Sequence, residues 1–309
     1  MGTVFVTGAT GVLGKGAVAE LVASGHSVRG LARNAERAGA VAATGAEPIV
    51  ADLYDVDDMK RAVADCDTVM HLATRIPPIM QARRASAWEE NSRLREEGTR
   101  VLVDAALANG VRHFVAESIT FIYTDGGSNW LDERSPVDAG VGLQPVLTLE
   151  HEVARFTEAG GIGIALRFGA FYGADARGTE EFLTAAKRRI APAAGPAAGF
   201  VSSIETGDAG RAAAAALAVP AGVYNVVDDV PLTRRELADA FAAAFGLHRL
   251  HITPAIALRL AGGAAAQALT RSQRVSNAAF KAASGWTPKH TSAVEGWKAV
   301  AASRGVSNG

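Results

Sequence analysis

The stretch TVFVTGATGVLGKG, residues 3–16, decides how the chain begins to fold. An apolar run ends at glycines 8, 11 and 14, and residues with helical spacing follow from Val12. A strand that turns sharply into a helix presents free backbone N–H groups and a positive dipole end to an anion. We therefore expect a nucleotide pyrophosphate here, with Gly8 in the turn, Gly11 beside the phosphates and Gly14 where helix and strand pack. A plain strand-to-helix turn is the alternative.

The composition sets the class of protein. Of 309 residues, 49% are hydrophobic and 20% charged, which is typical of a globular chain. A net charge of −1 leaves no basic surplus, so neither nucleic acid nor a membrane surface is an expected partner. A single cysteine, Cys66, excludes an intrachain disulfide and suits a reducing compartment. We expect a cytoplasmic protein with a small-molecule substrate, and leave a homodimer open.

Strand and helix patterns alternate through the first half. Short apolar runs predict strands at 4–6, 28–31, 48–51, 68–72, 113–116 and 162–166. Helical spacing lies between them, at 12–24, 88–108 and 150–158. Short buried strands separated by helices predict an α/β fold, a doubly wound parallel sheet of the Rossmann type with helices on both faces.

The second half is less regular. After Tyr172 we expect a loop at 191–200, a helix at 208–218 and a strand at 223–227 that returns to the sheet. From Thr233 the pattern is mostly helical. The chain thus divides into a dinucleotide-binding domain, 1–172 with 200–229 returning to it, and a smaller, mainly helical substrate lobe built from 173–199 and 230–309.

The form T-G-A-T-G-x-x-G resembles the extended short-chain dehydrogenase/reductase superfamily, in its NAD-dependent epimerase/dehydratase branch. Further matches follow in order along almost the whole chain. They are VMHLAT (69–74), EEGTRVLVDAALANGVRHFV (96–115), LRFGAFYG (166–173), GVYNVVDD (222–229) and GWTP (285–288).

The resemblance implies a set of cofactor contacts. Those at the phosphate loop are Thr7, Gly8, Thr10, Gly11, Val12 and Gly14. Asp52 and Leu53 stand where the family places the adenine. Leu72, Ala73 and Thr74 belong to the turn that passes under the nicotinamide ribose.

The second strand favours NADP over NAD. NAD-binding proteins usually end this strand in a carboxylate that accepts from the ribose 2′-hydroxyl. Here it ends in VRGLARNAER, with Arg33 and Arg37 and no carboxylate before Glu36. An arginine can pair with a 2′-phosphate through two charge-assisted hydrogen bonds. The alternative is a solvated arginine on a surface turn.

The usual acid–base residues of the family are missing. The family holds a substrate carbonyl with Ser or Thr and moves a proton with a Tyr, whose pKa is tuned by a Lys four residues later. Ile119 fills the catalytic serine place, and the Tyr and Lys places fall on Gln144 and Thr148. Shifting the register by two residues does not help, because no Tyr lies between Tyr123 and Tyr172 and no Lys between 60 and 187.

Tyr123 is the strongest replacement acid, because it follows the carboxyl end of a strand. Ser118, in the first serine place, would hold a carbonyl or a ribose. Both have a structural alternative, an aromatic wall for Tyr123 above all. Four more residues are candidates for the site, and each has a structural alternative. Glu117 could be a paired carboxylate and His71 a core histidine. Trp130 could join the two lobes, and Arg167 could support a loop.

These residues predict an NAD(P)-binding, oxidoreductase-like enzyme that acts on a small organic molecule with a non-standard acid or base. One alternative is a regulatory protein resembling the NmrA-like group, which would sense NADP without turnover. Another is a non-redox isomerase or dehydratase that keeps the nucleotide. The histidines at 248, 251 and 290 lack metal-ligand spacing, so no metal is expected.

Overall fold

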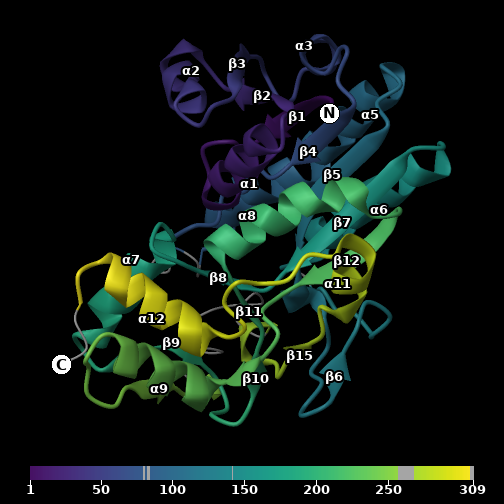
Figure 1. The fold of residues 1–309 in the computed structure, drawn as a ribbon. Coiled ribbons are helices and arrows are strands. Elements are labelled where there is room, and N and C mark those ends of the chain that lie inside the picture. Colours follow the sequence, from purple (N-terminus) through teal and green to yellow (C-terminus); the bar gives the residue numbers. More distant parts are fainter. Residues whose placement is uncertain (79–80, 82–83, 141, 257–267, 307–309) are drawn as a thin grey trace.

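A seven-stranded parallel sheet forms the centre of the molecule (Figure 1). This computed structural model describes residues 1–78, 81, 84–140, 142–256 and 268–306. The strand order is β12-β7-β5-β4-β1-β2-β3, and every neighbouring pair is parallel. The strands are β1 (Thr3–Thr7), β2 (Ser27–Ala32), β3 (Glu47–Val50), β4 (Thr68–His71), β5 (His113–Ile119), β7 (Ile162–Phe168) and β12 (Gly222–Val226). The predicted doubly wound sheet, with a last strand that returns to it, is confirmed.

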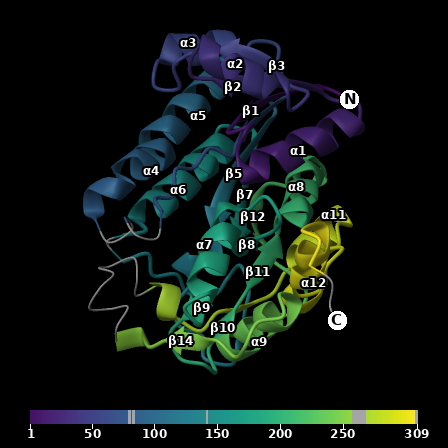
Figure 2. The ribbon, with the colours of Figure 1, turned by 90° about the vertical axis from the view of Figure 1, so that its left-hand side faces the viewer.

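Helices cover both faces of this sheet (Figure 2). One face carries α1 (Val12–Ala23), α2 (Ala35–Ala42), α8 (Thr206–Ala215) and α11 (Ala278–Ser284). The other carries α3 (Val56–Ala62), α5 (Thr99–Ala108) and α6 (Gln144–Glu158). Apolar residues alternate along the strands between two cores, as a sheet buried on both sides requires.

Two glycines let α1 and α8 approach closely. A Cβ atom on Gly210 of α8 would lie 2.7 Å from the backbone of Gly16 in α1. Such a distance leaves no room for a side chain at Gly210, and a Cβ atom on Gly16 would lie only 3.2 Å from the Cα atom of Gly210. The helix that starts at the glycine loop is therefore fixed by a segment almost two hundred residues further along the chain.

The long helix predicted over 88–108 is present but interrupted. It consists of α4 (Glu89–Arg93), a π-helical turn η2 (Leu94–Gly98) and α5, after a 3₁₀ turn η1 (Ala85–Trp88). π turns are rare and often accompany functional sites. The sequence did not predict this one.

A smaller lobe lies beyond the carboxyl side of the sheet (Figure 2). It contains α7 (Arg177–Ala186), α9 (Arg234–Ala244), α12 (Ala293–Ser303) and the strands β9 (Ile190–Ala194), β10 (Phe200–Val201), β13 (Leu232–Thr233) and β14 (His251–Thr253). A core around Phe241 and Trp297 holds it together. The expectation of a loop over 191–200 was wrong in part, because β9 pairs with β14 across sequence-distant segments.

Short strand pairs connect the two parts. β8 (Ala170–Tyr172) pairs with β11 (Ser203–Glu205), and β6 (Trp130–Leu131) pairs with β15 (Arg274–Val275). The 3₁₀ turns η3 (Thr120–Ile122) and η4 (Ala216–Ala218) follow β5 and α8. The predicted lobe boundary at 230–309 needs one correction, since Phe280 and Trp286 pack in the core of the sheet.

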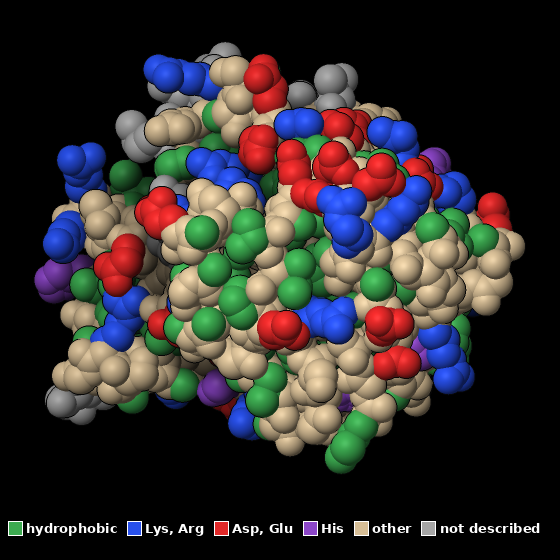
Figure 3. All heavy atoms as spheres, turned by 90° about the horizontal axis from the view of Figure 1, so that it is seen from above, with side chains coloured by type: hydrophobic (Ala, Val, Ile, Leu, Met, Phe, Trp, Pro, Cys, Tyr) green, Lys and Arg blue, Asp and Glu red, His purple; other side chains and the backbone are tan. Residues whose placement is uncertain are grey.

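The outer surface mixes charges of both signs. Viewed from above, Lys and Arg side chains alternate with Asp and Glu side chains over the end of the molecule near α2 and α3 (Figure 3). Within the described ranges, no helix combines the length and the apolar character needed to cross a membrane.

Candidate nucleotide site and the buried network beside it

The glycine loop between β1 and α1 is fixed by close contacts. Gly8 has a φ of +76°, and a Cβ atom there would lie 2.7 Å from the carbonyl oxygen of Leu72. A Cβ atom on Gly14 would collide with the carbonyl oxygen of Gly8. Glycine is therefore required at both places, at Gly8 by conformation and at Gly14 by packing.

The first turn of α1 is open to an anion. Gly11 is its N-cap, and among the described residues no side chain caps it and no acidic residue stands in its first turn. Thr10, Gly11 and Val12 are exposed. By contrast, Asn34 and Asp55 cap α2 and α3 with their side chains. The free N–H groups of α1 thus face solvent at the point where the strand order reverses, between β1 and β4.

Arg33 and Arg37 are exposed at the end of β2. Within the described part of the chain, neither forms an ion pair. Between them Asn34 accepts the N–H of Arg37 at 3.0 Å and starts α2. Two unpaired guanidinium groups beside a helix N-terminus can bind a phosphate.

The segment predicted at the adenine follows β3. Asp52 is exposed, and its Oδ1 accepts the N–H of Tyr54 at 3.0 Å. Leu53 is buried, and a Cβ atom on Gly98 of the π turn would lie 3.1 Å from it. The two neighbours therefore differ, one facing solvent and the other held in the core.

The end of β4 is anchored by His71. Its Nδ1 lies 2.6 Å from Oγ1 of Thr7, and its Nε2 lies 3.1 Å from the carbonyl oxygen of Leu94. A carbonyl only accepts, so Nε2 carries the proton and Nδ1 accepts from Thr7. Burial lowers the pKa of His71 to about 4, so it is neutral near pH 7. This arrangement favours a structural histidine over a proton shuttle.

After His71 the chain emerges toward solvent. Leu72 is buried, Ala73 half-buried and Thr74 exposed. The N–H of Leu72 bonds to the carbonyl oxygen of Thr7 at 3.2 Å. The predicted ribose segment therefore lies directly beside the glycine loop, as the contact between Leu72 and Gly8 also requires.

Tyr123 is completely buried. Its hydroxyl donates to Oδ1 of Asn225 at 2.8 Å and accepts from Nη1 of Arg167 at 2.9 Å. Its carbonyl oxygen accepts from Arg271 and Gln273. Burial raises the pKa of Tyr123, against the opposing effect of Arg167. The expectation that Tyr123 supplies a proton is not supported by this geometry, which is that of a structural tyrosine.

Ser118 is likewise completely buried. Its hydroxyl donates to Oε1 of Glu150 at 2.6 Å, and Glu150 forms a two-pronged ion pair with Arg167 at 2.7 and 2.8 Å. The serine is therefore occupied within the protein, which does not fit the expected contact with a carbonyl or ribose. The same ion pair joins Arg167 of β7 to Glu150 of α6.

The places expected for the family's acid–base pair lie on the first turns of α6. Gln144 is exposed and Thr148 half-buried, with the hydroxyl of Thr148 3.4 Å from the carbonyl oxygen of Gln144. Ile119, in the catalytic serine place, ends β5 and is half-buried. None of the three side chains can act as an acid at neutral pH.

Trp130 is half-exposed on β6. The guanidinium of Arg274 lies 4.3 Å from the centre of its ring, and β15 pairs with β6. The tryptophan therefore joins two distant segments, which favours the lobe-contact alternative over a lid.

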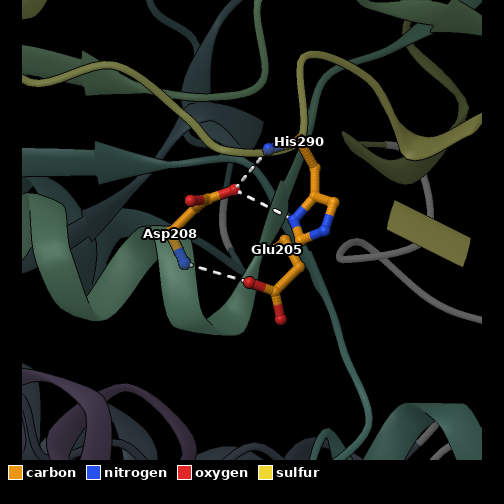
Figure 4. A group of neighbouring side chains, drawn as sticks. All are labelled: Glu205, Asp208 and His290. Carbon is orange, nitrogen blue, oxygen red and sulfur yellow. Dashed lines mark hydrogen bonds and ion pairs between the residues drawn. The ribbon is translucent and has the colours of Figure 1, made fainter. Parts of the chain in front are cut away.

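Glu205, Asp208 and His290 form a second polar cluster (Figure 4). The buried carboxylate of Asp208 accepts the backbone N–H groups of Lys289 and His290 at 2.8 and 3.0 Å and pairs with Arg211. Glu205 caps α8 through the N–H groups of residues 207 and 208. These oxygens are already engaged, so the cluster fits a junction between α8 and the GWTP segment better than a metal site.

A groove of about 300 Å³ lies at the β3 edge of the sheet. None of the residues predicted for the cofactor lines it. Its arginines pair locally, Arg29 with Glu47 at 3.7 Å and Arg61 with Asp58. The groove is therefore separate from the nucleotide loop.

Sequence comparison finds a family match in the first half of the chain and a relative over 94% of it. The NAD(P)H-binding family model matches residues 8–161. A 3-diazoavenalumate denitrifying reductase from a Streptomyces species is 35% identical over 305 residues, which cover 94% of this chain and 97% of that reductase. A 4-hydroxy-2-methyl-3-oxo-4-farnesyl-3,4-dihydroquinoline-1-oxide ketoreductase from Stigmatella aurantiaca is 36% identical over 122 residues, 40% of this chain and 35% of that enzyme.

Solved structures share the fold. A human epimerase family protein with NADPH superposes with a TM-score of 0.78 at 22% identity, over 97% of this chain and 99% of that one. UDP-glucose 4-epimerase from Thermus thermophilus in complex with NAD gives 0.77 at 23% identity, over 97% and 98%. One of these holds NADPH and the other NAD, so the fold alone does not choose between the two nucleotides.

Proposed function

The chain belongs to the NAD(P)H-binding family, and from that premise we propose that it is an NADPH-dependent reductase of a small, electron-poor organic molecule. The observation that carries the proposal is the full-length similarity to a reductase, combined with a glycine loop whose helix N-terminus is open. We take Ile119, Gln144 and Thr148 to stand at the places of the ordinary acid–base groups, as the family resemblance implies.

The cofactor-facing residues fit a dinucleotide. Gly8 lies against Leu72 and Gly14 against Gly8, while Gly11 leaves the N–H groups of α1 open for a pyrophosphate. Arg33, which is exposed and forms no ion pair with the residues that the structure describes, supports NADPH over NADH. When bound, the reduced nicotinamide supplies a hydride.

The missing acid points to a substrate that needs no proton from the protein. A ketone that accepts a hydride must also take up a proton on oxygen, which a Tyr–Lys pair normally assists. An aryl diazonium group behaves differently: its C–N bond breaks, a C–H bond forms from the hydride, and N₂ leaves without proton uptake. The reductase relative acts, by its name, on a diazo compound with loss of nitrogen. We propose the same class of acceptor for this chain.

Tyr123 and Ser118 have positioning roles in this proposal. Their hydroxyls are committed to Asn225, Arg167 and Glu150, which hold β5, β7, β12 and α6 together beneath the site. Both side chains are completely buried, so in this proposal they support the strand ends and their protons are not available to a substrate.

The test is NADPH oxidation with an aryl diazonium salt and, in parallel, with aryl ketones. NADPH deuterated at the transferred position should place deuterium on the ring carbon that lost nitrogen, with one N₂ released per NADPH. The rate should depend only weakly on pH between 6 and 8, because no enzyme acid titrates. Faster reduction of ketones, with a rate governed by an ionisable group, would contradict the substrate class. Tight NADPH binding without oxidation by any acceptor would favour the regulatory or non-redox alternative.

A further inference from the structure

One turn of helix, residues 91–95, holds the ends of two central strands. Oδ1 of Asn91 accepts the N–H of Arg75 at 3.0 Å, just after β4. The carbonyl oxygen of Leu94 accepts from His71 at the end of β4. Arg95 donates to the carbonyl oxygen of Glu117 at 3.0 Å and pairs with its carboxylate at 3.1 Å.

These polar groups are all inside the protein. Asn91, Arg95, His71 and Glu117 are each less than a tenth exposed. Burying an ion pair costs desolvation free energy, which offsets most of the attraction between the two charges unless the geometry is good. Arg95 also lies in the π turn, which changes the direction in which its side chain leaves the helix axis. The turn therefore places a buried guanidinium against Glu117, near the end of β5.

We propose that the turn 91–95 positions the nicotinamide half of the cofactor site, with Arg95 as the principal positioning residue. The proposal rests on the proposed function, since it assigns the loops after β4 and β5 to the nicotinamide and its ribose. The phosphate loop and Arg33 make no direct contact with Arg95 among the interactions of the described residues. Loss of Arg95 should therefore disturb one half of the site and spare the other.

Two ligands distinguish the nicotinamide half of the cofactor site from the adenosine half. NADPH occupies the whole site, whereas adenosine 2′,5′-bisphosphate carries only the adenosine and its phosphates. Calorimetric titration of wild type and Arg95→Met with both ligands gives the ratio of their dissociation constants. We expect NADPH to bind about tenfold more weakly to the variant, a change of about 1.4 kcal/mol, because the end of β5 loses the support of Arg95. The bisphosphate should bind within about twofold of wild type, a difference too small to reflect a lost contact.

The chain offers a matched control and a second variant. Arg234 is equally buried and also donates to backbone carbonyls, those of Leu269 and Arg271, but it lies in the smaller lobe. Arg234→Met should leave the ratio unchanged. If Arg95→Met fails to fold, the double variant Arg95→Met/Glu117→Leu removes both charges together and should still show the selective loss.

The outcomes are distinct. If the dissociation constants of both ligands change by the same factor, or neither changes, the positioning role is overturned and the Arg95–Glu117 pair is purely structural. If wild type binds neither ligand, the proposed function fails and this inference fails with it. If NADH proves to be the tighter nucleotide, NADH and ADP are the corresponding pair, with the same expected selectivity.

Discussion

The hydroxyl oxygen of Tyr123 lies 2.9 Å from Nη1 of Arg167, deep beneath the strand ends where a substrate would bind. Glu150 holds the same guanidinium from the opposite side. The tyrosine proton is directed to Asn225. The phenol thus connects the end of β5 to β7 and β12. Its removal should lower the stability of the fold more than the rate of turnover.

Tyr123→Phe should lower the free energy of unfolding by about 1–3 kcal/mol, because Asn225 and Arg167 each lose a buried partner. Urea unfolding measures this. Turnover per folded molecule should stay near that of wild type. Tyr224→Phe is the matched control, since that hydroxyl bonds to Pro220 at an exposed site, and it should change stability by no more than about 0.5 kcal/mol. A large loss of turnover in stable Tyr123→Phe would restore this residue as the acid.

Arg33→Ala should weaken NADPH binding about tenfold or more, since a charge-assisted hydrogen bond contributes about 1.5–3 kcal/mol. NADH lacks the 2′-phosphate and should bind both proteins alike. Fluorescence titration with each nucleotide checks this, with Arg134→Ala as the control because that side chain is 91% exposed and pairs with its near neighbour Asp132. Equal losses for NADPH and NADH would show that Arg33 does not read the phosphate.

Gly14→Ala should destabilise the protein strongly and abolish nucleotide binding, because the added methyl meets the carbonyl oxygen of Gly8. Gly39→Ala is the natural comparison. It also lies within a helix, α2, but a Cβ atom there has open space within 4 Å. It should raise stability by up to about 1 kcal/mol through helix propensity. Thermal unfolding and NADPH titration of the two variants test the packing role of the loop, which a tolerant Gly14→Ala would refute.

His71→Gln should remove an acid-dependent loss of stability. The pKa of folded His71 is about 4, below the ordinary 6.5, so between these values the unfolded chain binds more protons. Wild type should therefore lose about 1.4 kcal/mol per pH unit from this group as the pH falls through that window. The difference between wild type and variant, from urea unfolding at pH 7.5, 6 and 5, isolates the contribution. A constant difference would mean that His71 is not held neutral.

Asp228→Asn should act in the opposite direction. Burial raises the pKa of Asp228 well above its ordinary 3.8, and the hydroxyl of Tyr172 donates to it at 3.0 Å. Above pH 3.8 the unfolded chain releases this proton more readily than the folded one, so the group costs stability as the pH rises. The asparagine variant should be the more stable protein at pH 8 and lose that advantage toward pH 4. Parallel pH profiles of the two proteins would contradict the assignment.

The sequence predicted the local features well. The glycine loop, the strands and the return of β12 depend on short apolar runs and on glycines whose conformation is set by near neighbours. Arg33 was also placed correctly at the surface end of β2, because the strand pattern fixes where that strand stops.

The buried network could not be predicted in the same way. Tyr123 bonds to Asn225, 102 residues away, and only the packing of β5, β7 and β12 brings the two together. Ser118 was predicted to face a ligand, but Glu150 reaches it from α6. The π turn left no recognisable pattern in the sequence. Its buried ion pair did leave a signal, because Arg95 stands within an apolar helix and Glu117 within an apolar strand.

The contact between Gly16 and Gly210 has a consequence for synthesis on the ribosome. When the first six strands of the central sheet have left the exit tunnel, α1 still lacks the helix that packs beside it on the sheet, because α8 begins only at Thr206. Phe280 and Trp286, which complete the same core, emerge later still. The nascent chain therefore exposes the apolar flank of α1 for most of its translation. A nucleotide bound to the glycine loop at that stage would lie beside an incomplete core. Chaperone occupancy should persist until residues near 286 appear, and truncation before that point should yield aggregation rather than a smaller nucleotide-binding protein.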